Sequence, residues 1–130
     1  MNAPYVYDAG VLIAIDSSNR RMWARHHLAL EEGRQLIVPA IVIGQAWRDS
    51  RRQVVLGRFL RTCEIEPTSA EAAKEAGLLC GKAGTSDVVD AVVVATALAR
   101  QAIVLTSDPH DIAKLASASG ARPGLVVRGV

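Results

Sequence analysis

The chain has 130 residues, of which 50% are apolar and 22% are charged, and its formal net charge is +2. This composition excludes intrinsic disorder, and the length predicts one domain over residues 1–130 whose core needs no disulfide or structural metal. No uncharged apolar run approaches the roughly 20 residues that span a bilayer, and the start MNAPYVYDAG lacks the pattern of a signal peptide. Two lone cysteines, Cys63 and Cys80, are typical of a reduced protein, so we expect a cytoplasmic location.

Short apolar runs that suit strands alternate with helical patterns along the chain. We predict strands at 5–7, 35–38, 63–66, 102–105 and 125–127. We predict helices at 9–15, 20–32, 39–52, 54–61, 70–82, 87–100 and 109–115. This alternation indicates an α/β fold with a mainly parallel sheet flanked by helices.

Aspartates gather where the predicted strands end. Asp8 follows the first strand and Asp108 follows the fourth, and ligands of a parallel sheet bind beyond the carboxyl ends of its strands. Asp87 and Asp90 lie one turn apart on a helix whose N-terminus can point to the same edge, and Asp111 lies one turn after Asp108. Oxygen ligands without histidine or cysteine favour Mg²⁺ or Mn²⁺, which serve phosphodiester hydrolysis.

Helix capping is the alternative role for these acids. Asp87 suits an N-cap, with Asp90 at the third helical position, and Asp108 before Pro109 suits the N-cap of the next helix. Asp111 is then placed favourably near the positive end of that helix. The adjacent His26 and His27 diverge around a helix and cannot share a metal, so we expect both at the surface or in partner contacts.

The stretches VYDAGVLIAID, GTSDVVDAVVVATALA and VLTSDPHDIAKL resemble the PIN-domain ribonucleases, specifically the VapC toxins of bacterial toxin–antitoxin pairs. The resemblance spans nearly the whole chain in order, spacing and length. It implies a parallel sheet flanked by helices, RNA cleavage by clustered acids with Mg²⁺ or Mn²⁺, a homodimer, and inhibition by a VapB-type antitoxin. Matched by position, Asp8 is the first acid of the catalytic metal site, Asp90 the third and Asp108 the fourth.

The second acid of the family pattern is missing, because VPAIVIGQAW carries Gln45 where a glutamate is expected. Glutamine keeps a carbonyl oxygen but has no negative charge and cannot act as a general base. Asp16, two helical turns beyond Asp8, is one replacement acid, and Asp87 and Asp111 are others. The other alternative is that Gln45 itself remains in the site, as a neutral ligand for the metal or a hydrogen-bond donor to phosphate.

Arginine is concentrated after this position. Twelve of the fifteen basic residues are arginine, and five fall within fourteen residues: Arg48, Arg51, Arg52, Arg58 and Arg61. Such a patch binds phosphate or carboxylate groups, or is a solvated helix face. A helix through Trp47 suits a protein groove. We expect the patch to split, with Arg48 and Arg52 binding the RNA backbone and with Arg58 and Arg61 farther from it.

Two further readings stand beside the nuclease. Gln45 favours a catalytically weakened PIN-like module that binds RNA or a protein. A phosphatase of the haloacid dehalogenase kind is disfavoured, because that family's first motif resembles Asp-x-Asp and Gly10 stands at its second acid.

Overall fold

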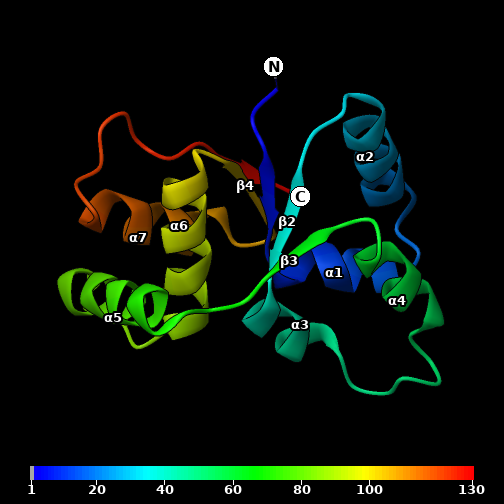
Figure 1. Cartoon of the computed structure of the whole chain (residues 1–130), viewed down its shortest axis with the longest axis horizontal. Helices are drawn as coiled ribbons and strands as arrows, with labels where there is room; N and C mark the ends of the chain where they lie inside the picture. Colours follow the sequence, from blue (N-terminus) through cyan, green and yellow to red (C-terminus); the bar gives the residue numbers. More distant parts are fainter. Residues whose placement is uncertain (1) are drawn as a thin grey trace.

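Five short strands form one parallel sheet in a computed structural model that describes residues 2–130 (Figure 1). The strands are β1 (Tyr5–Tyr7), β2 (Leu36–Pro39), β3 (Glu64–Glu66), β4 (Ile103–Thr106) and β5 (Val127–Gly129). Their order is β3-β2-β1-β4-β5, and each neighbouring pair is parallel. The predicted α/β class with a mainly parallel sheet is confirmed, while β5 lies two residues later than expected.

Helices cover both faces of this sheet. They are α1 (Ala9–Asp16), α2 (Arg20–Glu31), α3 (Ala40–Ala46), α4 (Val54–Leu60), α5 (Ala70–Ala83), α6 (Val88–Arg100) and α7 (Pro109–Ala118). Figure 1 shows α5, α6 and α7 on one side of the sheet and α1, α2 and α4 on the other. Within residues 2–130, every helix is too short or too polar to span a bilayer.

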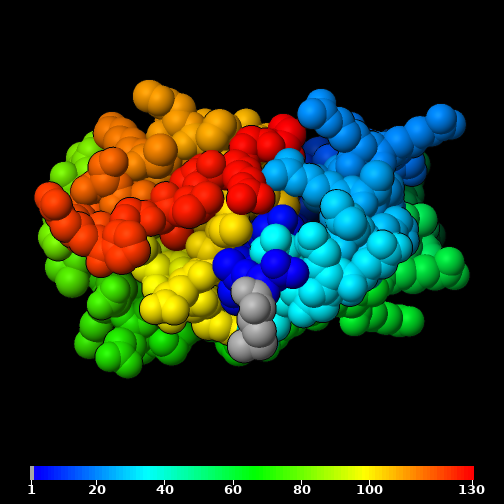
Figure 2. Space-filling model, turned by 90° about the horizontal axis from the view of Figure 1, so that it is seen from above, coloured from blue at the N-terminus to red at the C-terminus, as the bar shows by residue number. Residues whose placement is uncertain are grey.

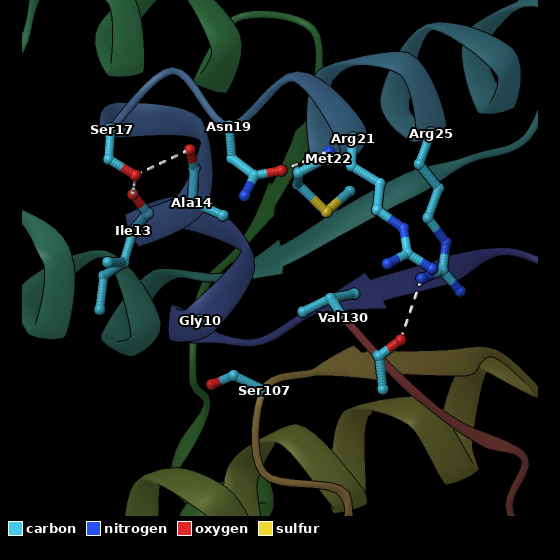
Figure 3. A pocket seen from close by; sticks show the side chains of 11 residues that line it. Gly10, Ile13, Ala14, Ser17, Asn19, Arg21, Met22, Arg25, Ser107 and Val130 are labelled. Atoms are coloured by element: carbon cyan, nitrogen blue, oxygen red, sulfur yellow. Dashed lines mark hydrogen bonds between the residues drawn. The ribbon is translucent and has the colours of Figure 1, made fainter.

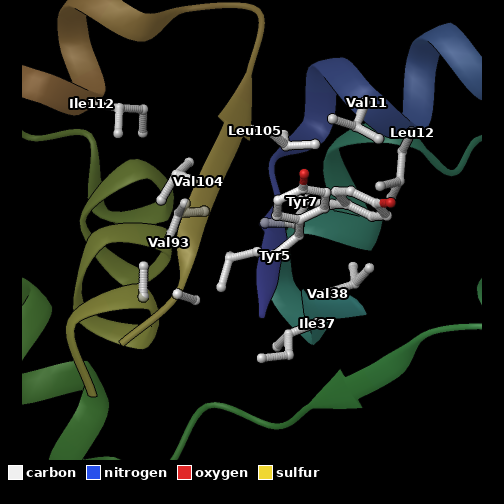
Figure 4. Packing of buried hydrophobic residues seen from close by; sticks show 14 of the residues in the cluster. Tyr5, Tyr7, Val11, Leu12, Ile37, Val38, Val93, Val104, Leu105 and Ile112 are labelled. Atoms are coloured by element: carbon white, nitrogen blue, oxygen red, sulfur yellow. The ribbon is translucent and has the colours of Figure 1, made fainter. Parts of the chain in front are cut away.

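The core lies on both faces of the central strands β1 and β4. Val104 and Leu105 are fully buried and point to opposite faces, as neighbouring residues of a strand do. Figure 4 shows Val104 beside Val93 of α6, whereas Leu105 lies near Tyr7 and Val11 on the side of α1. Strands that are apolar on both faces are typical of a parallel sheet covered by two helical layers.

Valine is a modest helix former, yet α6 carries five valines. Its N-terminus is capped by Asp87, whose carboxylate accepts the backbone N–H of Asp90 at 3.2 Å. The helix ends at Gln101, which adopts a left-handed conformation with φ of 51°. Because Val92, Val93 and Val94 are buried, packing outweighs helix propensity here.

The predicted helix from residue 39 to residue 52 is wrong in its second half, because α3 ends at Ala46. The side chain of Gln53 replaces the missing helical hydrogen bonds. Its carbonyl oxygen accepts the backbone N–H groups of Arg48 at 2.7 Å and Asp49 at 2.9 Å. Its amide nitrogen donates to the carbonyl of Ala46 at 2.8 Å, so a buried glutamine organises loop 47–53.

The expectation of a surface position is wrong for His26, which is 1% exposed. Its Nδ1 lies 2.9 Å from the Tyr7 hydroxyl and its Nε2 lies 2.9 Å from the Thr62 hydroxyl. Burial, with a smaller contribution from His27, lowers the pKa of His26 to about 4. The ring is therefore a neutral polar link between α2, β1 and the turn after α4.

Candidate metal centre

The strand order reverses direction at β1 and β4, which are neighbours in the middle of the sheet. At such a point the connections leave to opposite sides, and a crevice opens beyond the carboxyl ends of the two strands. Asp8 follows β1 directly and Asp108 follows β4 by two residues. The expectation that the first and fourth strands bring these two segments together is confirmed by the strand pairing.

Asp8 is 5% exposed and is held from two sides. Its Oδ1 accepts the backbone N–H of Ala9 at 2.8 Å, at the N-terminus of α1. Its Oδ2 accepts the hydroxyl of Thr106 at 2.7 Å. A buried carboxylate is costly without partners, so these hydrogen bonds allow Asp8 to remain in the crevice in a fixed orientation.

Thr106 connects the two acid-bearing segments, and the sequence reasoning missed it. The residue is fully buried at the end of β4. Its hydroxyl donates to Asp8 and accepts the backbone N–H of Asp108 at 3.0 Å. The sequence did contain a pattern that indicates this role: a hydroxyl residue ends a buried strand two positions before an aspartate.

A close approach of α1 to the segment after β4 also shapes the crevice. A Cβ atom on Gly10 would lie 2.1 Å from the Oγ of Ser107 and 3.0 Å from its backbone nitrogen. Any side chain at Gly10 therefore collides with the segment that carries Asp108. This contact explains why the first motif has glycine at position 10. The sequence alone had indicated only that Gly10 disfavours a phosphatase.

Three carboxylates converge at this edge of the sheet. Oxygen atoms of Asp90, Asp108 and Asp111 all lie within 4.8 Å of one another. Asp90 is buried on α6, whereas Asp108 and Asp111 are exposed at the start of α7. Asp108 occupies the N-cap position of α7, but its side chain makes no capping hydrogen bond. Its carboxylate therefore belongs to the acidic cluster and not to a cap.

Electrostatic strain in the cluster is largest at Asp90, whose pKa is raised to about 7. Burial is the main cause, followed by repulsion from Asp8, the hydrogen bond and charge of Asp87, and the charge of Asp108. The pKa of Asp111 is also raised, through its hydrogen bond with Asp108 and the charge of that group. Converging carboxylate oxygens that repel one another fit a hard divalent cation such as Mg²⁺ or Mn²⁺.

The other acids of the sequence analysis lie in different places. Asp87 caps α6 and adds its charge next to Asp90. Asp16 ends α1, an eight-residue helix about 12 Å long, so it lies at the opposite end from Asp8. There it accepts a hydrogen bond from Gln53 at 3.1 Å. The structure brings Asp111, and not Asp16, to the acidic cluster.

Gln45 lies in the last turn of α3 with an exposed side chain. Among residues 2–130 its amide has no hydrogen-bond partner. Arg48 and Arg52 are in loop 47–53, not on a helix face. Arg48 donates to the carbonyl oxygens of Gly44 at 2.9 Å and Trp47 at 2.7 Å, and the exposed Arg52 lies 3.8 Å from Asp49.

Comparison with known proteins places these observations in a family context. Residues 5–117 match the sequence model of the PIN domain. No curated protein sequence matches the chain significantly.

Solved structures with a similar fold include three toxin–antitoxin complexes. A chain of VapBC2 from Rickettsia felis, bound to a promoter DNA fragment, has a TM-score of 0.71 and 17% identity, covering 97% of this chain and 98% of that one. A chain of DNA-bound VapBC from Salmonella typhimurium has a TM-score of 0.68 and 17% identity, covering 98% of each chain. A chain of a Klebsiella pneumoniae toxin–antitoxin complex has a TM-score of 0.68 and 22% identity, covering 96% of each chain.

Proposed function

Because the chain belongs to the PIN domain family, we propose that it is a VapC-type endoribonuclease toxin that hydrolyses RNA phosphodiester bonds with Mg²⁺ or Mn²⁺. One observation carries this proposal. The carboxylate oxygens of Asp90, Asp108 and Asp111 converge within 4.8 Å, and the charge of the buried Asp8 acts on Asp90. The resemblance of the motifs, confirmed for the family, supports the same assignment.

We assign the catalytic and metal-binding roles to Asp8, Asp90 and Asp108. We propose Asp111 as the replacement for the missing second acid, because its carboxylate joins Asp90 and Asp108, whereas Gln45 carries no charge. A bound Mg²⁺ or Mn²⁺ supplies charge neutralisation for the phosphate and activation of water.

The chain's own contribution is to hold these acids in place. The hydroxyl of Thr106 fixes the orientation of Asp8, and the N–H of Asp108 donates to the same hydroxyl. Asp87 accepts the backbone N–H of Asp90 and thereby fixes the first turn of α6. The acids thus stay close despite their mutual repulsion, so little rearrangement is needed when the cation and the RNA phosphate arrive.

A protein partner is part of the proposal. The solved structures of similar fold include VapBC complexes, which supports a VapB-type antitoxin as the partner of this chain. We further propose a homodimer and a cytoplasmic location, as expected from the sequence.

A second candidate function follows from Gln45. Its amide is exposed and, within residues 2–130, makes no hydrogen bond to the acids. The position of the family's second acid on α3 therefore carries no acid. This favours a catalytically weakened PIN-like module that binds RNA or a protein partner. The two candidates differ in whether RNA is cut.

Incubation of the purified protein with total RNA separates them. We expect cleavage with Mg²⁺ or Mn²⁺ and none with EDTA, and we expect Asp8→Asn to remove most of the cleavage. The matched control is Asp49→Asn, which makes the same change at an exposed aspartate in loop 47–53. RNA that stays intact with either metal, while still binding the protein, would favour the non-catalytic module.

A further inference from the structure

A cavity of about 670 Å³ opens between α1, α2 and the C-terminal strand β5, next to the segments that follow β1 and β4 (Figure 3). Gly10 and Ser107, the two residues in close approach, form its edge towards the acids. Asp8 precedes Gly10 by two residues, and Asp108 follows Ser107 directly. The cavity therefore adjoins the two segments that carry Asp8 and Asp108.

One wall of the cavity is positively charged. Arg21 and Arg25 line it from α2, and Figure 3 shows their guanidinium groups on the same side of the cavity. Arg25 donates from Nη1 to the carbonyl of Gly129 at 3.0 Å, which ties α2 to the C-terminal strand. Figure 2 shows these two segments, blue and red, in contact on the upper face. The exposed Arg21 makes no hydrogen bond or ion pair with any residue from 2 to 130.

Helix stability does not explain this arginine. The first turn of α2 contains Arg20 and Arg21 and no acidic residue. Cations at this positive end of a helix are unfavourable. The guanidinium group of Arg21 therefore destabilises the first turn of α2. In the same position it would attract an anion bound in the cavity.

The opposite wall is apolar. Ile13 and Ala14 of α1 lie on it, and Met22 of α2 adds an apolar side chain beside Arg21. Ile13 is 54% exposed, although it belongs to a helix whose other large residues are buried. An apolar wall facing a guanidinium wall suits a nucleotide, because the base packs on one and the phosphate pairs with the other.

We propose that this cavity is a nucleotide subsite, which binds the RNA nucleotide next to the scissile phosphate, with Arg21 and Arg25 on its phosphate and Ile13 beneath its base. The inference rests on the proposed ribonuclease function. An RNA strand over four aspartates is repelled by them, and the arginine wall supplies the missing attraction on one side of the cut. The subsite thus gives the strand a fixed position relative to the acidic cluster.

Binding of a fluorescent single-stranded RNA oligonucleotide, measured in EDTA over a series of salt concentrations, tests the subsite without cleavage. Arg21→Ala should weaken binding and reduce the slope of log K against log salt by about 0.7, the value for one phosphate contact on a single strand. Ile13→Ser should weaken binding and leave the slope unchanged. Arg58→Ala removes an exposed arginine of α4 that does not line the cavity, and it should leave the slope unchanged.

Cleavage with Mn²⁺ separates this inference from the proposed function. Arg21→Ala should raise KM several-fold while kcat and the Mn²⁺ affinity stay at the wild-type values. If wild type cleaves RNA but Arg21→Ala matches Arg58→Ala in slope and KM, the subsite is wrong and the nuclease stands. Loss of antitoxin binding without loss of RNA binding in Arg21→Ala would likewise overturn the subsite, in favour of a protein-binding cavity. A wild type that binds RNA with the predicted slopes but never cuts it would contradict the nuclease instead.

Discussion

At the scale of single residues, the hydroxyl of Thr106 holds the acids of the site in place. It donates to the buried carboxylate of Asp8 and accepts the backbone N–H of Asp108, and replacing it removes one hydrogen bond from each. Thr106→Val keeps the side-chain shape and should cost about 1–3 kcal/mol in the free energy of unfolding. We expect a weaker affinity for Mn²⁺ as well, because Asp8 loses its fixed orientation.

Thermal unfolding and titration with Mn²⁺ measure both effects. Thr106→Ser, which keeps the hydroxyl, is the control and should bind Mn²⁺ nearly as wild type does. Wild-type affinity for Mn²⁺ in Thr106→Val would show that this hydroxyl does not position the acid.

A second prediction at the residue scale concerns pH. His26 is buried and neutral, and its pKa is lowered to about 4 from 6.5. A group whose pKa falls on folding stabilises the protein above its unfolded pKa, and this stabilisation is lost as the pH falls from about 6.5 towards 4. The loss amounts to at most about 3 kcal/mol, since one pKa unit corresponds to about 1.4 kcal/mol.

Urea unfolding at several pH values tests this, with His27→Gln as the control because His27 is exposed. His26→Gln should be less stable than wild type at pH 7 and should lose less stability on acidification. A His26→Gln variant with the wild-type pH dependence would mean that His26 is not the titrating group.

At the scale of elements, loop 47–53 depends on Gln53. This residue is 5% exposed and uses its amide fully, with two accepted and two donated hydrogen bonds. We expect Gln53→Ala to lower the free energy of unfolding by about 2–4 kcal/mol, since each lost hydrogen bond is worth about 1 kcal/mol. The Mn²⁺ affinity should stay unchanged, because the loop meets α1 at Asp16, about 12 Å from Asp8.

Urea denaturation and Mn²⁺ titration test this pair of expectations. Gln35→Ala, at an exposed glutamine before β2, should have no effect on either quantity. A large loss of Mn²⁺ affinity in Gln53→Ala would indicate that the loop, with Asp16 and Arg48, contributes to the metal site. RNA binding by Arg48 and Arg52 stays a prediction, which the same salt series as for Arg21 can measure.

The elements also show what sequence patterns can and cannot predict. Local patterns predict the alternating strands and helices and place Asp8 and Asp108 at one edge, because all strands of a parallel sheet end at the same edge. The end of α3 escapes them, because the competing hydrogen bonds come from Gln53, seven residues after Ala46. The choice of Asp111 over Asp16 depends on distances between side chains, which a one-dimensional spacing does not contain.

His26 is a different case, since a signal was present and went unused. It lies four residues after Met22 and three before Ala29, and all three side chains are buried on one face of α2. This spacing is typical of a helix face that packs on the core. Its position next to His27 suggested that both histidines lie at the surface. Neighbouring residues of a helix point in different directions, however, so one ring is buried and the other exposed.

At the scale of the whole molecule, the fold places a cavity lined by arginines next to the segments that carry the acids. The strand order puts the acids beyond β1 and β4, and the contact of Gly10 with Ser107 sets α1 against that edge. The cavity with Arg21 and Arg25 continues from there along α2. A single-stranded polyanion is the ligand whose chemistry matches both an acid site for a cation and a neighbouring guanidinium wall.

The central claim is that the clustered acids cut RNA, and the rate of RNA cleavage at saturating Mn²⁺ by Asp90→Asn tests it most directly. Asp16→Asn is the matched control, because it makes the same chemical change at the far end of α1. We predict that Asp90→Asn loses activity by on the order of 100-fold or more while Asp16→Asn keeps the wild-type rate. Full activity of Asp90→Asn, or loss of activity in Asp16→Asn alone, would contradict the account.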